Sequence, residues 1–416
     1  MSGDERPCPV CGARAGEVLH HRRFVLPDGH PLAGGYTVVT CRECDAAYAT
    51  PLPPQEAYDR FYRDTSRYAD AATGTGSGAQ AWDEERLADT ARQLAAFMPG
   101  RDAHIVDVGC GAGGLLRQLR QLGYTKLTGI DPAPACVASV EQVEGVRGAV
   151  GSLFALPAGL EPAGLVVLSH VLEHVREAGR AVDRLRWLVP RGGRVYAEVP
   201  DAGRYAEFIV APFLDFNTEH INHFSVRTFE RLFASRGWRV VASGTKCIRS
   251  SPTALYPCAW VLAEALDALD EPSADSRDRA GPSPGPGPGP GDGVLRGALQ
   301  RYVAASDVLL ARITAHCTGV NIAGRDVIVW GTGQTTAILL AETPLGAARI
   351  VAFTDSNPVH YGKTIAGAPV VPPERLRDMP DVPVVIGSLL HGTEIAEAIA
   401  ARGFTNPVIR LDPSAP

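Results

Sequence analysis

Short apolar runs alternate with helical stretches along the middle of the chain. Within residues 103–245 the apolar runs read HIVDVG, LTGID, GLVVLSHV, RVYAEVP and WRVVAS. Buried strands that alternate with helices are typical of a parallel sheet covered on both faces. The pattern therefore predicts an α/β, Rossmann-like domain in this part of the chain.

A second alternation of the same kind follows a helical segment at 295–316. Between residues 325 and 412 the chain reads DVIVWGTG, RIVAFTD, VPVVIGS and NPVIRLD, which predicts a second Rossmann-like domain. The apolar stretch at 252–268 predicts a helix. The segment after it, EPSADSRDRAGPSPGPGPGPGDG, is too rich in Pro and Gly to bury a core, so a linker is expected.

The first hundred residues differ in pattern from the rest. Residues 1–52 are rich in turn formers, and residues 55–98 have helical spacing with an apolar stripe through Leu87, Leu94 and Phe97. The start, MSGDERPCPVCG, lacks the apolar core of a signal peptide. No run approaches the roughly 18–20 apolar residues of a membrane helix. We therefore expect a cytoplasmic protein without a membrane anchor.

Composition narrows the class of partner. The 416 residues are 45% hydrophobic and 21% charged, which is ordinary for a globular protein of two or three domains. The net charge of −6 argues against a general nucleic-acid or anionic-membrane binder, because both need a basic face. A small-molecule substrate is the expected partner.

Four of the nine cysteines form two CxxC pairs, Cys8 with Cys11 and Cys41 with Cys44. Four thiolates are the ligand set of a structural zinc site. The 29 residues between the pairs exceed the usual spacing, but a loop can be inserted without moving either pair. A redox CxxC or unpaired thiols are the alternatives. The remaining five cysteines are predicted to be small buried apolar residues: Cys110, Cys136, Cys247, Cys258 and Cys317.

A glycine-rich turn follows the first predicted strand. Asp107 ends that strand, and Gly109, Gly111 and Gly113 follow, so no Cβ keeps a ligand from the backbone. Asp131 ends the next strand, where a carboxylate can bind both hydroxyls of a ribose. A dinucleotide-binding loop is the alternative, although it would follow GxGxxG more closely.

This combination resembles the class I S-adenosylmethionine-dependent methyltransferases. Their first motif, an acid followed by GxGxG, matches the stretch from Asp107 to Gly113, and the resemblance covers roughly residues 100–245. It implies S-adenosylmethionine as the cofactor and Asp131 as the ribose-binding acid. It also implies that Ser152 and Leu153 contact the adenine. The segment SHVLEHV, which includes His170, would line the site.

The stretch NTEHINHFS lies in an insertion, residues 201–224, between the fifth strand and a helix for which Ser225 is the expected N-cap. Ligands bind at the carboxyl ends of strands in such sheets. We therefore expect the insertion to bring polar side chains to the methyl acceptor, with two histidines from the neighbouring strand end. These residues are Glu219, His220, Asn222 and His223, together with His170 and His174.

A metal site is one alternative for this cluster, although the spacing of His220 and His223 is i,i+3 and not the i,i+4 of HExxH. Structural roles for His170 and His174 are another.

The whole chain, with its paired cysteines, helical lead-in, EHxxHF stretch and C-terminal domain, resembles the sugar C-methyltransferases, which methylate nucleotide-linked 4-keto-deoxysugars at C3. The resemblance implies that His220 is the general base, with Glu219 and His174 beside it, and that Tyr68 orients the substrate. A histidine suits this chemistry because its pKa lies near neutral pH. Asn222, His223 or a tyrosine could donate to the enolate oxygen.

The resemblance implies five segments along the chain. They are a zinc-binding module at 1–54, a helical lead-in at 55–99, a methyltransferase domain at 100–271, a linker at 272–294, and a C-terminal Rossmann-like, nucleotide-sugar-binding domain at 295–416. Methyl transfer to oxygen or nitrogen of a sugar or natural product remains an alternative. So does a non-catalytic protein that binds S-adenosylmethionine or a nucleotide sugar.

The C-terminal domain has its own glycine turn. Gly331 and Gly333 open it, and Asp355 lies 22 residues past Gly333, where a ribose-binding acid would be. Thr336 replaces the third glycine of a dinucleotide fingerprint. Binding of the substrate's nucleotide, a scaffold without a ligand, and a redox cofactor all remain open.

Overall fold

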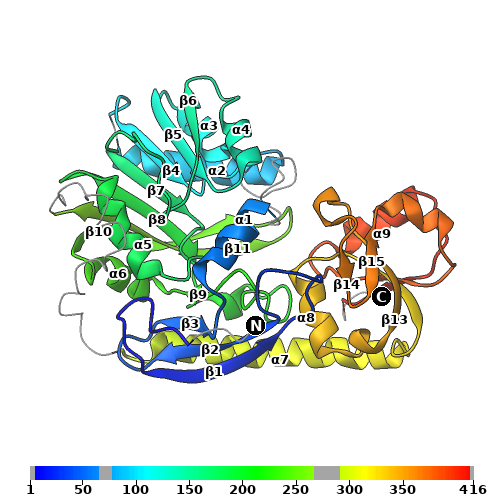
Figure 1. The fold of residues 1–416 in the computed structure, drawn as a ribbon. Coiled ribbons are helices and arrows are strands. Elements are labelled where there is room, and N and C mark those ends of the chain that lie inside the picture. Colours follow the sequence, from blue (N-terminus) through cyan, green and yellow to red (C-terminus); the bar gives the residue numbers. More distant parts are fainter. Residues whose placement is uncertain (1–4, 65–76, 99, 267–290, 413–416) are drawn as a thin grey trace. The chain divides into compact units, whose positions relative to one another are not determined.

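The computed structural model describes residues 5–64, 77–98, 100–266 and 291–412 (Figure 1). The predicted substrate tyrosine, Tyr68, and most of the predicted linker lie outside these residues. The chain packs into two compact units. The first unit contains residues 1–19, 39–208 and 219–298, and the second contains residues 20–38, 209–218 and 299–416.

A seven-stranded sheet forms the centre of the first unit. Its strands, in spatial order, are β10 (Trp238–Arg249), β11 (Leu255–Ala265), β8 (Arg194–Pro200), β7 (Leu165–Ser169), β4 (His104–Val108), β5 (Lys126–Asp131) and β6 (Val146–Val150). The pairs from β8 to β6 are all parallel, whereas β11 runs antiparallel to both of its neighbours. The predicted Rossmann-like α/β domain is confirmed.

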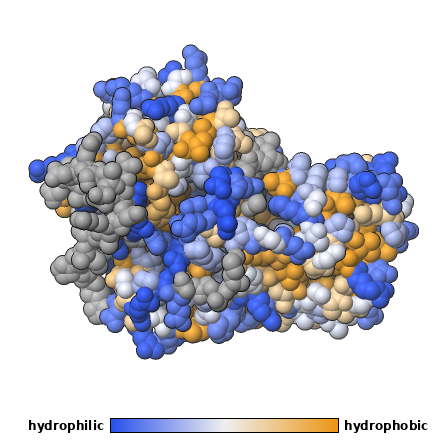
Figure 2. Space-filling view, in the orientation of Figure 1, coloured by the Kyte–Doolittle hydropathy of each residue, from blue (hydrophilic) through white to orange (hydrophobic). Residues whose placement is uncertain are grey.

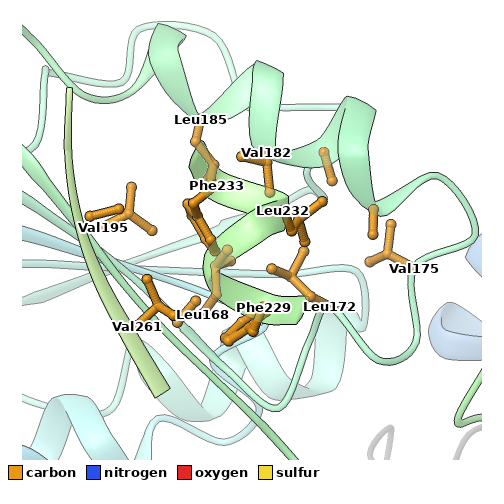
Figure 3. Close-up of a cluster of buried hydrophobic side chains, with 14 of the residues drawn as sticks. Leu168, Leu172, Val175, Val182, Leu185, Val195, Phe229, Leu232, Phe233 and Val261 are labelled. Carbon is orange, nitrogen blue, oxygen red and sulfur yellow. The ribbon is translucent and has the colours of Figure 1, made fainter. Parts of the chain in front are cut away.

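Helices cover both faces of this sheet. One core cluster joins α2 (Ala81–Phe97) and α3 (Gly114–Gln121) to the strands, and it includes Leu87 and Leu94 of the predicted apolar stripe. Val140, from α4 (Pro134–Val140), belongs to the same cluster. A second cluster packs α5 (Ala178–Arg184) and α6 (Val226–Ala234) against the sheet, as Figure 3 shows for Phe229 and Phe233.

The helix predicted at 252–268 is wrong, because this stretch forms β11. Val261 and Ala263 belong to one core cluster and Leu262 belongs to the other, so both faces of this strand are covered. A strand covered on both sides shows a continuous apolar run without alternation, and periodicity cannot distinguish that run from a buried helix.

The helix after the insertion begins as predicted. The Ser225 side chain accepts a hydrogen bond from the Thr228 backbone N–H, and the Thr228 hydroxyl accepts one from the Ser225 N–H at 2.9 Å. This reciprocal pair satisfies two N–H groups that the first turn of α6 leaves without partners. It fixes where the 201–224 insertion ends.

A small sheet contains Cys41 and part of the insertion. Its order is β1 (Gly16–Arg23), β2 (Gly35–Cys41), β3 (Ala47–Thr50) and β9 (Asn222–His223). The last two strands are antiparallel, with Ala47 opposite His223. Helix α1 (Gln55–Asp64) follows β3 closely in the chain.

The second unit contains a six-stranded sheet in the order β14 (Thr364–Ile365), β15 (Ala368–Val371), β13 (Arg349–Thr354), β12 (Asp326–Trp330), β16 (Val384–Ile386) and β17 (Val408–Arg410). Its pairs are parallel apart from β14 with β15. Its helices include α8 (Gln334–Glu342) and α9 (Gly392–Ala401), and the predicted helix near residue 300 is α7 (Val294–Gly319). Short 3₁₀ turns occupy Pro344–Ala347, Pro358–His360 and Pro373–Asp378 in this unit, and Leu185–Trp187 and Tyr205–Glu207 in the first unit.

Hydrophilic and hydrophobic residues are interspersed over the face shown in Figure 2. Among the helices in the described part of the chain, none has both the length and the apolar character that crossing a bilayer requires.

Candidate functional site

The four paired cysteines converge on one point. The sulfur atoms of Cys8 and Cys44 lie 3.5 Å apart, those of Cys11 and Cys41 lie 3.6 Å apart, and all four lie within 4.8 Å of one another. A tetrahedral ion with metal–sulfur bonds of about 2.3 Å has sulfur–sulfur edges of about 3.8 Å. The four thiols therefore fit one zinc ion, with no coordination position left for a substrate.

Both pairs are shaped by the same backbone turn. The N–H of Gly12 donates to the carbonyl of Cys8, and the N–H of Asp45 donates to the carbonyl of Cys41, each at 2.9 Å. Gly12 and Asp45 both have positive φ, at 78° and 64°. The Asp45 carboxylate also accepts the N–H of Leu295 at 2.8 Å, near the start of α7.

Of the five remaining cysteines, four are buried as predicted, and Cys247 is exposed, so the prediction for Cys247 is wrong. It lies on β10, the edge strand of the central sheet.

The glycine turn after β4 requires glycine for two different reasons. Gly109, Gly111 and Gly113 have φ of 79°, 51° and 78°. A Cβ on Gly109 would lie 2.6 Å from Cγ2 of Val171, and one on Gly113 would lie 2.9 Å from Cγ2 of Val140, so both are closely packed. A Cβ on Gly111 would meet nothing within 4 Å. The turn is therefore open at Gly111, where a ligand can approach the backbone.

The Asp131 carboxylate is fixed beside this opening. One oxygen accepts the N–H of Gly111 and the other accepts the N–H of Ala133, both at 2.9 Å. Each oxygen keeps a second lone pair, which a ribose hydroxyl can use. Burial raises the pKa of Asp131, although the two N–H groups oppose this. Burial, and then the neighbouring Asp131, raise the pKa of Asp107 to about 7.

Ser152 and Leu153 follow β6 at the same edge of the sheet. The N–H of Gly151 donates to the Asp131 carbonyl at 3.0 Å, so the two predicted adenine contacts begin next to the ribose-binding acid. The Ser152 hydroxyl accepts the N–H of Phe154 at 3.2 Å, and Leu153 is buried. Their place is consistent with an adenine site, and their role stays a prediction.

His170 lies between two buried carboxylates. Its Nδ1 is 3.2 Å from Glu173, and its Nε2 is 3.2 Å from Glu198 and 3.7 Å from the Cys258 sulfur. Burial opposes the charged ring, but Cys258 and the two carboxylates outweigh it and raise the pKa of His170 well above its usual value.

Glu198 contacts His170, Lys246 and Tyr196. It is fully buried on β8, forms an ion pair with Lys246 and accepts the Tyr196 hydroxyl at 2.7 Å. Burial opposes its charge, but Lys246 and His170 keep its pKa well below the usual range. The motifs in the sequence did not point to Glu173, Glu198 or Lys246. The signal for Glu198 was a charged residue inside the apolar strand RVYAEVP, since buried charges need partners.

His223 is fully buried and packs edge-on against Tyr205, with ring centroids 6.1 Å apart. Burial, and then Arg6, lower the pKa of His223 to about 3, so the ring is neutral. The ring has no exposed surface, and the role predicted for His223, donation to a substrate oxygen, stays a prediction.

Asn222 is buried as well, and its side chain forms hydrogen bonds to two other segments of the chain. Its amide nitrogen donates to the carbonyls of Leu172 and Val175 at 2.8 and 2.7 Å, and its oxygen accepts from Arg6 at 2.8 Å. These bonds occupy both amide N–H groups, so the role predicted for Asn222 as a donor to the enolate oxygen is not supported. The side chain instead ties the insertion to the segment after β7.

His174, which is buried, and His220, which is partly buried, contact each other at the site. Their ring centroids lie 5.0 Å apart at 61°. His174 Nδ1 lies 3.0 Å from the Glu219 carbonyl, which can only accept, so this nitrogen carries the proton. His174 Nε2 is 3.7 Å from Glu173, and the Tyr62 ring packs edge-on against His174 at 5.6 Å. Tyr62 belongs to the predicted helical lead-in, and its ring contacts the pair formed by His174 and His220.

The metal alternative also has a geometric basis. Ligand atoms of Glu173, His174 and His220 all lie within 4.8 Å of one another. Glu219, the acid that the sequence placed here, is buried, and its carbonyl is the group that fixes His174.

The second unit repeats the bonding of Asp131. One oxygen of Asp355 accepts the backbone N–H and hydroxyl of Thr332 at 2.8 and 2.7 Å, and the other accepts the N–H of Asn357 at 2.9 Å. Thr336, which replaces the third glycine, donates its hydroxyl to the Gly331 carbonyl at 2.9 Å.

Comparison with known proteins agrees with this geometry. A family model described as "Methyltransferase domain" matches residues 79–243, which include the glycine turn, Asp107 and Asp131. Residues 79–243 form an S-adenosylmethionine-dependent methyltransferase domain. Its fold is the class I, Rossmann-like type that the sequence predicted, and the chain is a methyltransferase.

Several solved structures are similar to part of this chain. A 1,6-didemethyltoxoflavin-N1-methyltransferase from Burkholderia thailandensis is 18% identical with a TM-score of 0.39, covering 53% of this chain and 96% of its own. A methyltransferase from Mesorhizobium loti is 17% identical with a TM-score of 0.36, covering 43% and 99%. The magnesium protoporphyrin IX methyltransferase from Synechocystis is 18% identical with a TM-score of 0.34, covering 44% and 84%. A search of curated proteins gave no match.

Proposed function

We propose that this methyltransferase transfers a methyl group to carbon in a nucleotide-linked keto-deoxysugar, through an enolate formed by His220. The contact between His174 and His220 carries the proposal, with ring centroids 5.0 Å apart. Both residues follow strands of the central sheet on its ligand-binding edge, where an acceptor would meet the cofactor. A carbon acid needs a base at this position, and transfer to a more nucleophilic atom needs it less.

The state of each histidine supports His220 as the base. His170 lies between the buried carboxylates of Glu173 and Glu198, and His223 is buried. His174 commits its Nδ1 proton to the Glu219 carbonyl, which suits a residue that orients its neighbour. His220 remains the candidate to accept the proton from the carbon beside the ketone. Tyr62, at the edge of the His174 ring, takes the orienting role that the sequence gave to Tyr68.

The residues present fit S-adenosylmethionine. Asp131 would accept the ribose hydroxyls, the open backbone at Gly111 would lie against the cofactor, and Ser152 and Leu153 would contact the adenine. When bound, this cofactor supplies an electrophilic methyl group. Asp107, buried behind the turn, would shape the turn and not contact the acceptor.

Two further assignments belong to the same proposal. The thiols of Cys8, Cys11, Cys41 and Cys44 hold a structural zinc ion, which their spacing fits. The second unit binds the nucleotide of the substrate, because Asp355 at its glycine turn is bonded as Asp131 is at the first. The net charge of −6 agrees with a small-molecule substrate in place of a nucleic acid.

The test is a panel of nucleoside-diphosphate-linked 4-keto-deoxysugars incubated with S-adenosylmethionine in deuterated water. Carbon methylation predicts a mass gain of one methyl group, located on carbon, together with deuterium exchange beside the ketone. Methyl transfer without exchange would instead indicate an oxygen or nitrogen acceptor. Cofactor binding without transfer to any member would favour a binding protein. Strong activation by added Mg²⁺ or Mn²⁺ would favour a metal at Glu173, His174 and His220.

A further inference from the structure

Arg6 connects three segments of the first unit from a buried position. Its guanidinium donates to the carbonyl of Ala49 at 2.9 Å and to that of Ile221 at 2.6 Å. It also donates to the carbonyl of Arg176 and to the side-chain oxygen of Asn222. Three of these acceptors lie in the two segments that carry His220 and His174.

The acceptors of Arg6 are unusual for a buried arginine. All four are neutral oxygens, and no ion pair joins Arg6 to a carboxylate in the part of the chain that the structure describes. Its ring contact is Tyr48, with the guanidinium carbon 5.3 Å from the ring centroid. A buried cation without an anionic partner is costly, and the hydrogen bonds to these four oxygens compensate its charge.

The bonds around Arg6 converge on the loop 219–223. The N–H groups of Ile221 and Asn222 both donate to the Glu173 carbonyl, at 2.9 and 3.1 Å. Asn222 in turn donates to the carbonyls of Leu172 and Val175. Arg6 is the charged group at the centre of this network, since it bonds to both the loop and residue 176.

We propose that Arg6 is a positioning residue, which locks the loop 219–223 onto the segment 172–176 and thereby sets the contact between His220 and His174. The proposal rests on the proposed function, because it supposes that this contact serves the reaction. Arg6 touches neither histidine ring in the bonds described, so it acts through Asn222 and the backbone.

The position of Arg6 in the chain adds a consequence. Arg6 precedes Cys8 by two residues, and β3, which begins three residues after Cys44, pairs with β9 in the same loop. Both ends of the cysteine module therefore contact the loop that carries His220. Metal loss from the four thiols should loosen this loop before it affects the glycine turn, whose bonds lie within β4, β5 and α3.

The test is Arg6→Lys, which keeps the charge but replaces a planar fork by a single ammonium that cannot reach all these carbonyls. We expect amide hydrogen exchange at Ile221 and Asn222 to accelerate about 10–100-fold, the effect of losing one or two charge-assisted hydrogen bonds. NMR signals of the His174 and His220 rings should shift. S-adenosylmethionine affinity should stay within about twofold, because Arg6 has no bond to the turn or to Asp131. The kcat for methyl transfer should fall about 10–100-fold.

Arg186→Lys is the matched control. Arg186 is also buried, donates to two carbonyls, of Arg236 and Gly237, and lies 5.3 Å from a ring, that of Trp238, but it has no bond to the loop. It should leave exchange at 219–223 unchanged. Removing metal from the wild-type protein with a chelator should accelerate exchange in the same loop.

The proposal is overturned if Arg6→Lys leaves loop protection at the wild-type level, or if protection falls equally across the central sheet and cofactor binding falls with it. It is also overturned if the loop loosens while kcat stays unchanged on an identified acceptor. If no ketosugar is methylated by the wild type, the proposed function fails. The exchange and ring-signal results still decide whether Arg6 positions the loop.

Discussion

The carboxylate of Asp131 accepts the backbone N–H of Gly111 at 2.9 Å, so the acid at the end of β5 braces the glycine turn that follows β4. Its other oxygen accepts the N–H of Ala133. The acid therefore has two tasks, shaping the turn and offering its free lone pairs to a ribose. Both depend on its being an acceptor at both oxygens.

Asp131→Asn should weaken S-adenosylmethionine binding by about 1.5–3 kcal/mol, because an amide nitrogen would face an N–H and would remove one charged acceptor. Isothermal calorimetry measures this directly. Asp355→Asn is the matched control, since Asp355 is bonded alike, to Thr332 and Asn357, in the second unit. Equal losses in the two variants, or none in Asp131→Asn, would contradict the cofactor site.

Asp107 should make the stability of the ligand-free protein fall as pH rises. The pKa of Asp107 is raised to about 7 in the folded protein, so the folded state keeps a proton that the unfolded chain releases between about pH 4 and 7. Stability from this group is present below that window and is lost as pH rises through 7. Asp107→Asn removes the dependence. Its stabilising effect should be larger at pH 8 than at pH 5.5 by about 2 kcal/mol, from 1.36 kcal/mol per pKa unit. Urea unfolding at both pH values tests this, and equal effects would show that Asp107 is ionised throughout.

The parallel strands were predictable because each is short, apolar and followed by a helix, a pattern that few other folds produce. β11 was not, because core clusters cover both of its faces and remove the alternation that marks a strand. Pairing between strands distant in sequence decides that burial, and local periodicity does not contain it.

In the candidate site, too, some residues could be predicted from local sequence and others could not. Asp107 and Asp131 were predictable, since each ends a strand and the two strands pair directly. Arg6, Tyr62 and Lys246 were not, because they come from segments far from the histidines in sequence and reach them only through tertiary packing. The histidine states could not be read either. Cys258 and two carboxylates raise the pKa of His170, whereas burial and Arg6 lower that of His223, and the motifs include neither set of neighbours.

Cys8→Ser should release about one zinc ion per chain and destabilise the cysteine module, because metal binding contributes to folding free energy at such sites. Elemental analysis of freshly purified protein measures the metal. Cys247→Ser is the control, since Cys247 is exposed and lies outside the four-thiol cluster. Wild-type protein without zinc, or equal metal content in both variants, would remove the assignment.

His220→Ala should leave S-adenosylmethionine binding intact, because the cofactor site is built from the glycine turn and Asp131. Turnover on the acceptor should fall about 10²–10⁴-fold, the range for a positioned general base. Solvent exchange of the acceptor's carbon-bound proton should disappear with methyl transfer. His223→Phe should act differently. It changes a buried neutral ring that packs on Tyr205, so it should alter thermal stability more than the rate of exchange.

His174→Asn distinguishes the two histidines of the pair. The asparagine amide can still donate to the Glu219 carbonyl, as Nδ1 does, but it removes the ring that contacts His220 and Tyr62. If His174 only orients His220, this variant should lose about tenfold to a hundredfold in turnover and retain measurable proton exchange. Retained exchange in His220→Ala, with exchange abolished in His174→Asn, would assign the base to His174. Equal and complete losses in both, restored in the wild type only by added divalent metal, would instead place a metal ion between Glu173, His174 and His220, where their ligand atoms converge.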